Sequence, residues 1–130
     1  MKRNKITILI YNGNEPLPKQ GGMERVTDSL AKGLKDKGFN VILLCKNKNR
    51  LGEIYTSPVP LYFIPDNNPQ EYIKQIILNN NITHIIDQGE GEIIGRFGFF
   101  KKRDIFFKDI VMIAVQHSSA MSIINNYRII

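Results

Sequence analysis

Short apolar segments recur along this chain, with room for a helix between most of them. Such runs of isoleucine, leucine and valine are typical of strands buried on both faces. They span Lys5–Tyr11, Asn40–Lys46, Pro60–Ile64, Thr83–Asp87 and Ile110–Gln116. Strands that alternate with helices form parallel sheets with helices on both sides. The sequence therefore predicts an α/β fold, a doubly wound parallel sheet in three layers with strand order 3-2-1-4-5. Its core is expected to centre on Ile8, Ile10, Leu43, Ile85 and Ile113.

Length and composition are those of a single domain. The chain has 130 residues, of which 42% are hydrophobic, so we expect one core over residues 1–130 and no second full domain. No stretch approaches the roughly 20 apolar residues that span a membrane, and no small-residue cleavage site follows the first apolar run. We expect a soluble, cytoplasmic chain. Cys45 lies within the apolar run VILLC, where a thiol is typically a small buried hydrophobe.

The first amphipathic segment follows a glycine pair, Gly21 and Gly22. Its apolar residues recur at helical spacing and predict a buried stripe of Met23, Val26, Leu30 and Leu34. The charged residues expected to face away from the sheet are Arg25, Asp28, Lys32 and Asp36. Gly38 is expected to end this helix in the left-handed conformation.

A second helix is predicted from the segment NPQEYIKQIILNNN. Asn68 can cap it, Pro69 suits its first position, and Glu71 lies where a capping box places a carboxylate. Its expected buried face consists of Tyr72, Ile73, Ile76 and Ile77. Residues 47–60 indicate an irregular surface crossover, and residues 89–108 indicate a helix or a pair of helices.

Polar residues follow three of the predicted strands. Parallel strands direct their carboxyl ends to one edge of the sheet, which is where such sheets bind ligands. The residues expected at this edge are Asn12, Gly13, Asp87, Gly89, His117, Ser118 and Ser119. Glycines at the start of a helix let backbone amides approach a ligand, and those amides with the helix dipole favour an anion such as phosphate. The alternative is a turn that needs positive φ at the Gly21–Gly22 pair and binds nothing.

Several common functional motifs are missing. The sequence contains no dinucleotide-binding glycine motif after the first strand, no P-loop and no nucleophile elbow. No spacing of histidine, cysteine and carboxylate indicates a metal site, so no metal is expected. His84 is interpreted as a hydrogen-bonded histidine within the sheet. Ser118 and Ser119 are interpreted as caps of a following helix.

The segment GGMERVTDSLAKGLKDKGFNVILLCK, followed much later by AVQHSS, resembles the N-terminal domain of GT-B glycosyltransferases of the retaining family 4. That family has Gly-Gly-x-Glu, a helix with a Leu-Ala-x-x-Leu core, a glycine turn into the second strand and a histidine after a later strand. The matching residues here are Gly21, Gly22, Glu24, Leu30, Ala31, Leu34, Gly38, Val41 and His117. The resemblance covers nearly the whole chain.

The resemblance implies a Rossmann-like, acceptor-side half of a transferase. Gly21 and Gly22 would lie near the diphosphate of a nucleotide-sugar donor, and His117 would be the catalytic residue near the donor sugar. Glu24, Asn12 and Asp87 are candidate acceptor-binding residues. The expected co-substrates are a nucleotide-sugar and a glycan or lipid-linked saccharide, with transfer under retention and no cofactor. The family holds the donor in a C-terminal domain, and residues 1–130 lack the counterpart, so this segment alone is expected to be inactive.

The net charge of +6 favours an anionic partner but does not identify one. Arg96–Lys108 mixes basic and aromatic residues, which is compatible with nucleic acid, with an anionic membrane surface reached peripherally, or with a core whose lysines face solvent. The last of these is favoured, and nucleic acid is the least expected partner. The alternative function is a stand-alone Rossmann-like module that binds an anionic ligand or nucleic acid.

Overall fold

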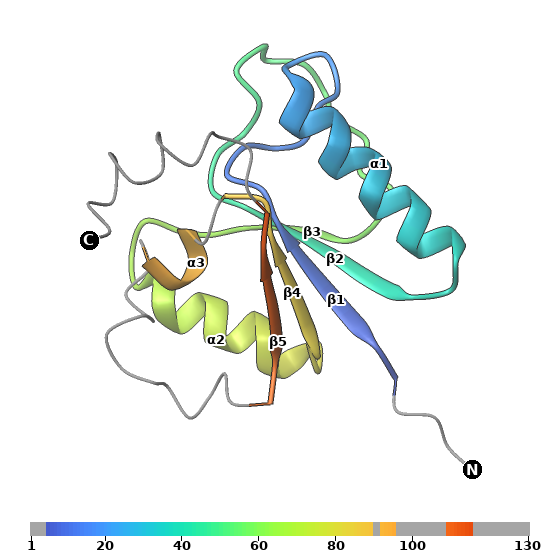
Figure 1. Cartoon of the computed structure of the whole chain (residues 1–130). Coiled ribbons are helices and arrows are strands. Elements are labelled where there is room, and N and C mark those ends of the chain that lie inside the picture. The colour runs from blue at the N-terminus through green and yellow to red at the C-terminus, as the bar shows by residue number, and fades with distance from the viewer. Residues whose placement is uncertain (1–4, 90–91, 96–108, 116–130) are drawn as a thin grey trace, which may run out of the picture.

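The computed structural model describes residues 5–89, 92–95 and 109–115. It confirms a five-stranded parallel sheet with the predicted order β3-β2-β1-β4-β5 (Figure 1). The strands are β1 (Thr7–Tyr11), β2 (Asn40–Cys45), β3 (Leu61–Phe63), β4 (His84–Asp87) and β5 (Val111–Ala114). The helices are α1 (Gly22–Asp36), α2 (Pro69–Asn79) and the short α3 (Glu92–Gly95). The architecture is Rossmann-like.

Helices lie on both faces of the sheet, as the continuous apolar strands predict (Figure 1). Strand residues alternate between the faces. One face packs against α2 and α3, through the buried residues Leu9, Tyr11, Ile42, Leu44, Ile73, Ile76, Ile77, Ile85 and Ile93. The other packs against α1, through Ile8, Ile10, Ala31, Val41 and Leu43. Four of the five predicted central residues, Ile8, Ile10, Leu43 and Ile85, are buried as expected.

Ile113 is the exception among the predicted core residues, since its side chain is 48% exposed. It lies on β5, the edge strand, and pairs with Ile86 on the sheet face that α1 covers. Helix α1 packs against β2, toward the opposite edge of that face. An apolar strand sequence therefore did not distinguish a central strand from an edge strand.

Helix α1 is rotated relative to the predicted orientation. Val26, expected in the buried stripe, is 52% exposed, whereas Thr27 and Ala31 are fully buried. Asp28, expected to face away, is also buried, because the chain after β2 folds beside the helix and the Tyr55 hydroxyl donates to Asp28 Oδ1 at 2.7 Å. The apolar stripe predicted the helix and the packing of Leu30 and Leu34 against the core, and it correctly placed Arg25, Lys32 and Asp36 outside. It was wrong for Val26 and Asp28.

The helix ends follow the sequence in part. Gly38 has φ of 91°, so the left-handed residue predicted after α1 is confirmed. Pro69 is the first residue of α2, as expected. Asn68 precedes it in a left-handed conformation and makes no side-chain cap bond, and Glu71 accepts from Gln75 instead. The predicted capping box is therefore not formed.

Among the described residues, no helix combines the length and apolar character needed to cross a membrane. Cys45 is buried at the end of β2, as expected, and burial, followed by the nearby Glu15 carboxylate, raises the pKa of its thiol. His84 lies within β4 with its Nδ1 2.7 Å from Thr83 Oγ1, which confirms its interpretation as a hydrogen-bonded sheet residue.

Candidate functional site

The first turn of α1 lies at the carboxyl edge of the sheet. Strands β1, β4 and β5 end level with one another, since Tyr11 pairs with Asp87 and Asp87 pairs with Ala114. The chain leaves β1 beyond this edge, forms a bridge between Asn14 and Asn47, and enters α1 at Gly22 (Figure 1). The predicted meeting of strand ends and helix start is thus present in the fold.

Three backbone donors at this helix start have no acceptor in the described part of the chain. The first intrahelical acceptor, the Gly21 carbonyl, serves the N–H of Arg25 at 3.1 Å. The N–H groups of Gly22, Met23 and Glu24 precede it, and α1 has no side-chain cap. Such orphan amides, together with the positive end of the helix dipole, form an anion-binding arrangement.

The glycine pair has no conformational need for glycine. Gly21 has φ of 177° and ψ of 178°, which is extended backbone that any residue adopts, and Gly22 is helical. The alternative of a positive-φ turn is therefore excluded. A Cβ on Gly22 would have no heavy atom within 4 Å, and one on Gly21 would meet only Glu24 Oε1, at 3.1 Å. The missing side chains leave open space in front of the amides.

Glu24 is held against the start of its own helix. Its side chain is buried, and Oε1 accepts from Gln20 Nε2 at 3.4 Å. Gln20 is itself oriented by the N–H of Arg50, which donates to Gln20 Oε1 at 2.7 Å. Of the predicted site residues, Gly21, Gly22 and Glu24 are therefore brought together.

Asn12 is buried at the end of β1 and is engaged on both sides. Its Oδ1 accepts from Thr27 Oγ1 at 2.8 Å, and its Nδ2 donates to the Asn14 carbonyl at 2.6 Å. These contacts connect β1 to α1 and shape the loop between them. In this structure both polar groups of the Asn12 side chain are therefore used to hold α1 and the loop before it in place.

Asp87 ends β4 and holds the turn into α3. Its two carboxylate oxygens accept from the N–H groups of Gly89 and Ile93, each at 2.8 Å. The side chain is 1% exposed. Asp87 therefore orders the backbone of the turn after β4. It lies at the same edge of the sheet as the end of β1, the neighbouring strand.

His117, Ser118 and Ser119 lie outside the described residues, as does Arg96–Lys108. Strand β5 ends at Ala114, and the N–H of the next residue, Val115, donates to the Asp87 carbonyl at 2.9 Å. The proposed catalytic role of His117 stays a prediction.

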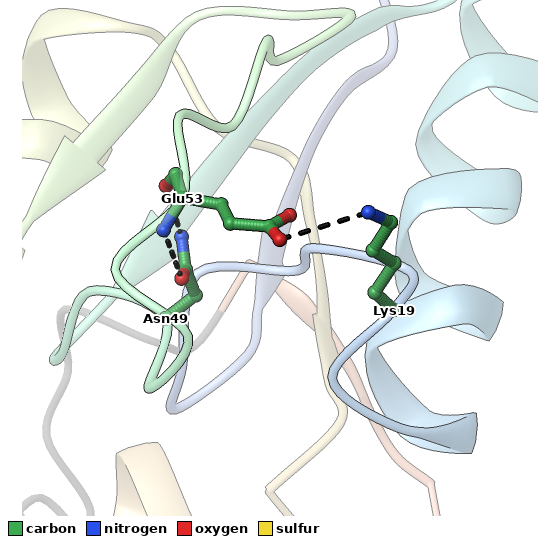
Figure 2. A network of polar contacts seen from close by, with 3 residues as sticks. All are labelled: Lys19, Asn49 and Glu53. Atoms are coloured by element: carbon green, nitrogen blue, oxygen red, sulfur yellow. Dashed lines mark hydrogen bonds and ion pairs between the residues drawn. The ribbon is translucent and has the colours of Figure 1, made fainter.

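A polar network beside the helix start was not predicted from the sequence. Glu15 accepts from the Asn49 backbone and side chain. Asn49 exchanges hydrogen bonds with the Glu53 backbone, and Lys19 pairs with the Glu53 carboxylate at 3.6 Å (Figure 2). These bonds join the loop after β1 to the chain after β2. The network borders a hollow of about 430 Å³, which is lined by Glu15, Lys48, Asn49, Gly52, Glu53, Ile54 and Tyr55.

The turn-forming residues of the 47–60 segment predicted an irregular loop in which such polar contacts form. This prediction could not name Glu15 as the partner, because that contact joins residues 34 positions apart. Within residues 5–89, 92–95 and 109–115, no group of three or more histidine, cysteine or acidic residues is placed to hold a metal ion. Chemically, the arrangement can donate hydrogen bonds to an anion at α1 and accept one at Glu24.

Comparison of the chain with protein-family models, with curated proteins and with solved structures finds no match.

Proposed function

We propose that this chain is the acceptor-side half of a retaining glycosyltransferase, and that the first turn of α1 binds the diphosphate of a nucleotide-sugar. The observation that carries the proposal is the set of three orphan amides at Gly22, Met23 and Glu24, placed at the ligand-binding edge of a parallel sheet. The resemblance of the Gly-Gly-x-Glu segment to family 4 connects this anion site with sugar transfer.

The chemistry required of this site is stabilisation of charge. Transfer breaks the bond between the anomeric carbon of the donor sugar and a phosphate oxygen and forms a bond from that carbon to an acceptor hydroxyl oxygen. The hydroxyl loses its proton, and negative charge is left on the departing diphosphate. Fixed amides and a helix dipole that already point at this oxygen stabilise the charge without reorganising. The acceptor is a glycan or lipid-linked saccharide, and the cytoplasmic location expected from the sequence belongs to the same proposal.

The test is an amide-resolved NMR titration of the chain with uridine and guanosine diphosphate. We expect the amide signals of Gly21 to Glu24 to shift with saturating dependence on at least one of them. Gly22→Val places methyl groups in the open space before the amides and should weaken binding about 10- to 100-fold, the equivalent of one charge-assisted hydrogen bond.

The matched control is Gly33→Val. Gly33 also lies in α1, and a Cβ there likewise meets nothing within 4 Å, but it is three turns from the helix start. Both variants should keep the free energy of unfolding within about 1 kcal/mol of wild type, since valine has a slightly better helix propensity than glycine. Amide signals at Gly21 to Glu24 that do not respond to either nucleotide would refute the proposal. Equal responses to inorganic pyrophosphate, nucleoside diphosphates and oligonucleotides would favour the general anion-binding module.

A further inference from the structure

One oxygen of the buried Glu24 carboxylate, Oε2, has no hydrogen-bond partner among the described residues. The residue is 6% exposed, and Oε2 itself is buried. A buried carboxylate oxygen without a donor loses its hydration and gains nothing in return, so such atoms are rare in native structures. Oε2 is therefore an acceptor that the described residues leave unsatisfied.

This acceptor lies beside the orphan donors of the same helix turn. The carboxylate folds back toward the start of α1, with Oε1 3.1 Å from where a Cβ of Gly21 would be. Gln20 and the N–H of Arg50 fix its orientation. The turn consequently offers two opposite functions together: amides that favour an anion, and a negative carboxylate that repels a bare anion and requires a hydrogen-bond donor.

A ligand satisfies both functions if it carries an anionic group and a hydrogen-bond donor close together, as a phosphoryl group and a neighbouring sugar hydroxyl do. We infer that the first turn of α1 binds a sugar phosphate, whose phosphoryl oxygens accept from the orphan amides while one sugar hydroxyl donates to Glu24 Oε2. The inference rests on the proposed function and narrows it, because it makes Glu24 the residue that distinguishes a sugar-bearing phosphate from phosphate alone. A nucleotide-sugar and a phosphorylated acceptor sugar share this chemistry.

The test compares two probes, methyl phosphate and glucose 1-phosphate, by NMR titration of the Gly22 amide in wild type and in Glu24→Met. Methionine retains the length of the side chain but has neither charge nor a strong acceptor. Wild type should bind glucose 1-phosphate at least 10-fold more tightly than methyl phosphate. In Glu24→Met, methyl phosphate should bind more tightly than in wild type and glucose 1-phosphate more weakly, so that the preference disappears.

Glu71→Met is the matched control, because Glu71 occupies the first turn of α2 in an exposed position. It loses the same first-turn charge and should retain the wild-type preference for glucose 1-phosphate. Thermal unfolding adds a second measurement. Glu24→Met should unfold at a temperature no lower than Glu71→Met, because it removes an unpartnered buried charge.

The outcomes separate the inference from the function on which it rests. An unresponsive Gly22 amide with both probes would overturn the proposed function and the inference together. Saturable binding of methyl phosphate without a preference for glucose 1-phosphate would overturn the inference alone. A preference that survives in Glu24→Met, or a loss of both affinities together with a lower unfolding temperature, would show that Glu24 has a structural role.

Discussion

Gly89 lies at a point of close approach after β4. A Cβ there would be 3.0 Å from both Tyr11 Cε2 and Glu92 Cβ, and 3.1 Å from Asp87 Oδ1. The tyrosine belongs to the central strand and is fully buried, so it has little room to move. The Gly89 N–H also donates to Asp87, which fixes the backbone in this position. The glycine is required here by packing.

We predict that Gly89→Ala lowers the free energy of unfolding by about 1–3 kcal/mol, the usual cost of forcing an extra carbon into a packed site. Gly33→Ala is the control, because its Cβ meets nothing and alanine in a helix interior gains about 0.5–1 kcal/mol over glycine. Urea unfolding followed by circular dichroism measures both. A Gly89→Ala protein as stable as wild type would show that Tyr11 and Glu92 move aside freely.

The sequence alone could not distinguish these glycines. Gly22, Gly38 and Gly89 are glycines for different reasons: open space before orphan amides, a left-handed backbone, and a close contact. The sequence assigned Gly38 one physical reason, because a glycine after a helix has a local signature, but it left two reasons open for Gly22. The contacts of Gly89 come from residues far away in the sequence. The same limit applies to Asp87, whose position at a strand end was predictable and whose two backbone donors were not.

At the level of elements, α1 is tied to the sheet by one buried polar contact. Thr27 Oγ1 donates to Asn12 Oδ1 at 2.8 Å, and both residues are fully buried. Ala31, one turn further on, is also fully buried, and its small side chain lets the helix approach the strands. The contact lies one turn beyond Glu24, so it also sets the position of the helix start.

We predict that Thr27→Val lowers the free energy of unfolding by about 1–3 kcal/mol. Valine keeps the shape of threonine but leaves the Asn12 oxygen buried without its donor. Thr27→Ser keeps the hydroxyl and loses one methyl group, which costs about 1 kcal/mol. Chemical denaturation of the three proteins should rank them wild type, serine, valine in decreasing stability. Valine more stable than serine would mean that the methyl contact outweighs the hydrogen bond.

The existence of α1 was predictable from its apolar spacing, and its rotation was not. Met23, Val26, Leu30 and Leu34 form the most hydrophobic stripe, yet the helix buries Glu24, Thr27, Asp28 and Ala31 most deeply. Polar partners decided the orientation, since Asn12 and Tyr55 reach the helix from other elements. The spacing of apolar residues cannot predict the rotation of a helix when that rotation is set by polar side chains from distant parts of the sequence.

For the whole molecule, the sheet was the most predictable feature. Strand order follows from short connections and right-handed crossovers once five strands and two intervening helices are assigned. The start of α1 at the ligand edge follows from the same topology, which is why the Gly21–Gly22 pair was expected at one edge with the strand-end residues Asn12 and Asp87. The Glu15–Asn49–Glu53 network was not predictable, because its loops have no periodic pattern. The unpartnered Glu24 oxygen is visible only in three dimensions.

Stability at alkaline pH provides a test of the core as a whole. The net charge of +6 at pH 7 falls toward zero near pH 9.5, so self-repulsion decreases and should stabilise the fold over this range. Cys45 acts in the opposite direction. Burial, and then the Glu15 carboxylate, raise the pKa of its thiol well above the ordinary value of 9.0, so only the unfolded chain releases this proton as pH rises past 9.

The sign of the Cys45 effect follows from this raised pKa. The stabilisation that the buried, protonated thiol adds to the free energy of unfolding is fully present below pH 9. It is lost progressively above pH 9, by about 1 kcal/mol between pH 9 and pH 10. Tyr55, whose pKa burial and Asp28 also raise from 10.0, acts in the same direction only at higher pH. Cys45→Ala should be less stable at pH 7, because it leaves a small cavity, but should lack the Cys45 part of the decline. Urea unfolding at half-unit steps from pH 8 to pH 10 measures the difference between the two proteins, in which the common charge effect cancels. A constant difference across this range would mean that the thiol ionises equally well in the folded chain, and that the end of β2 admits water.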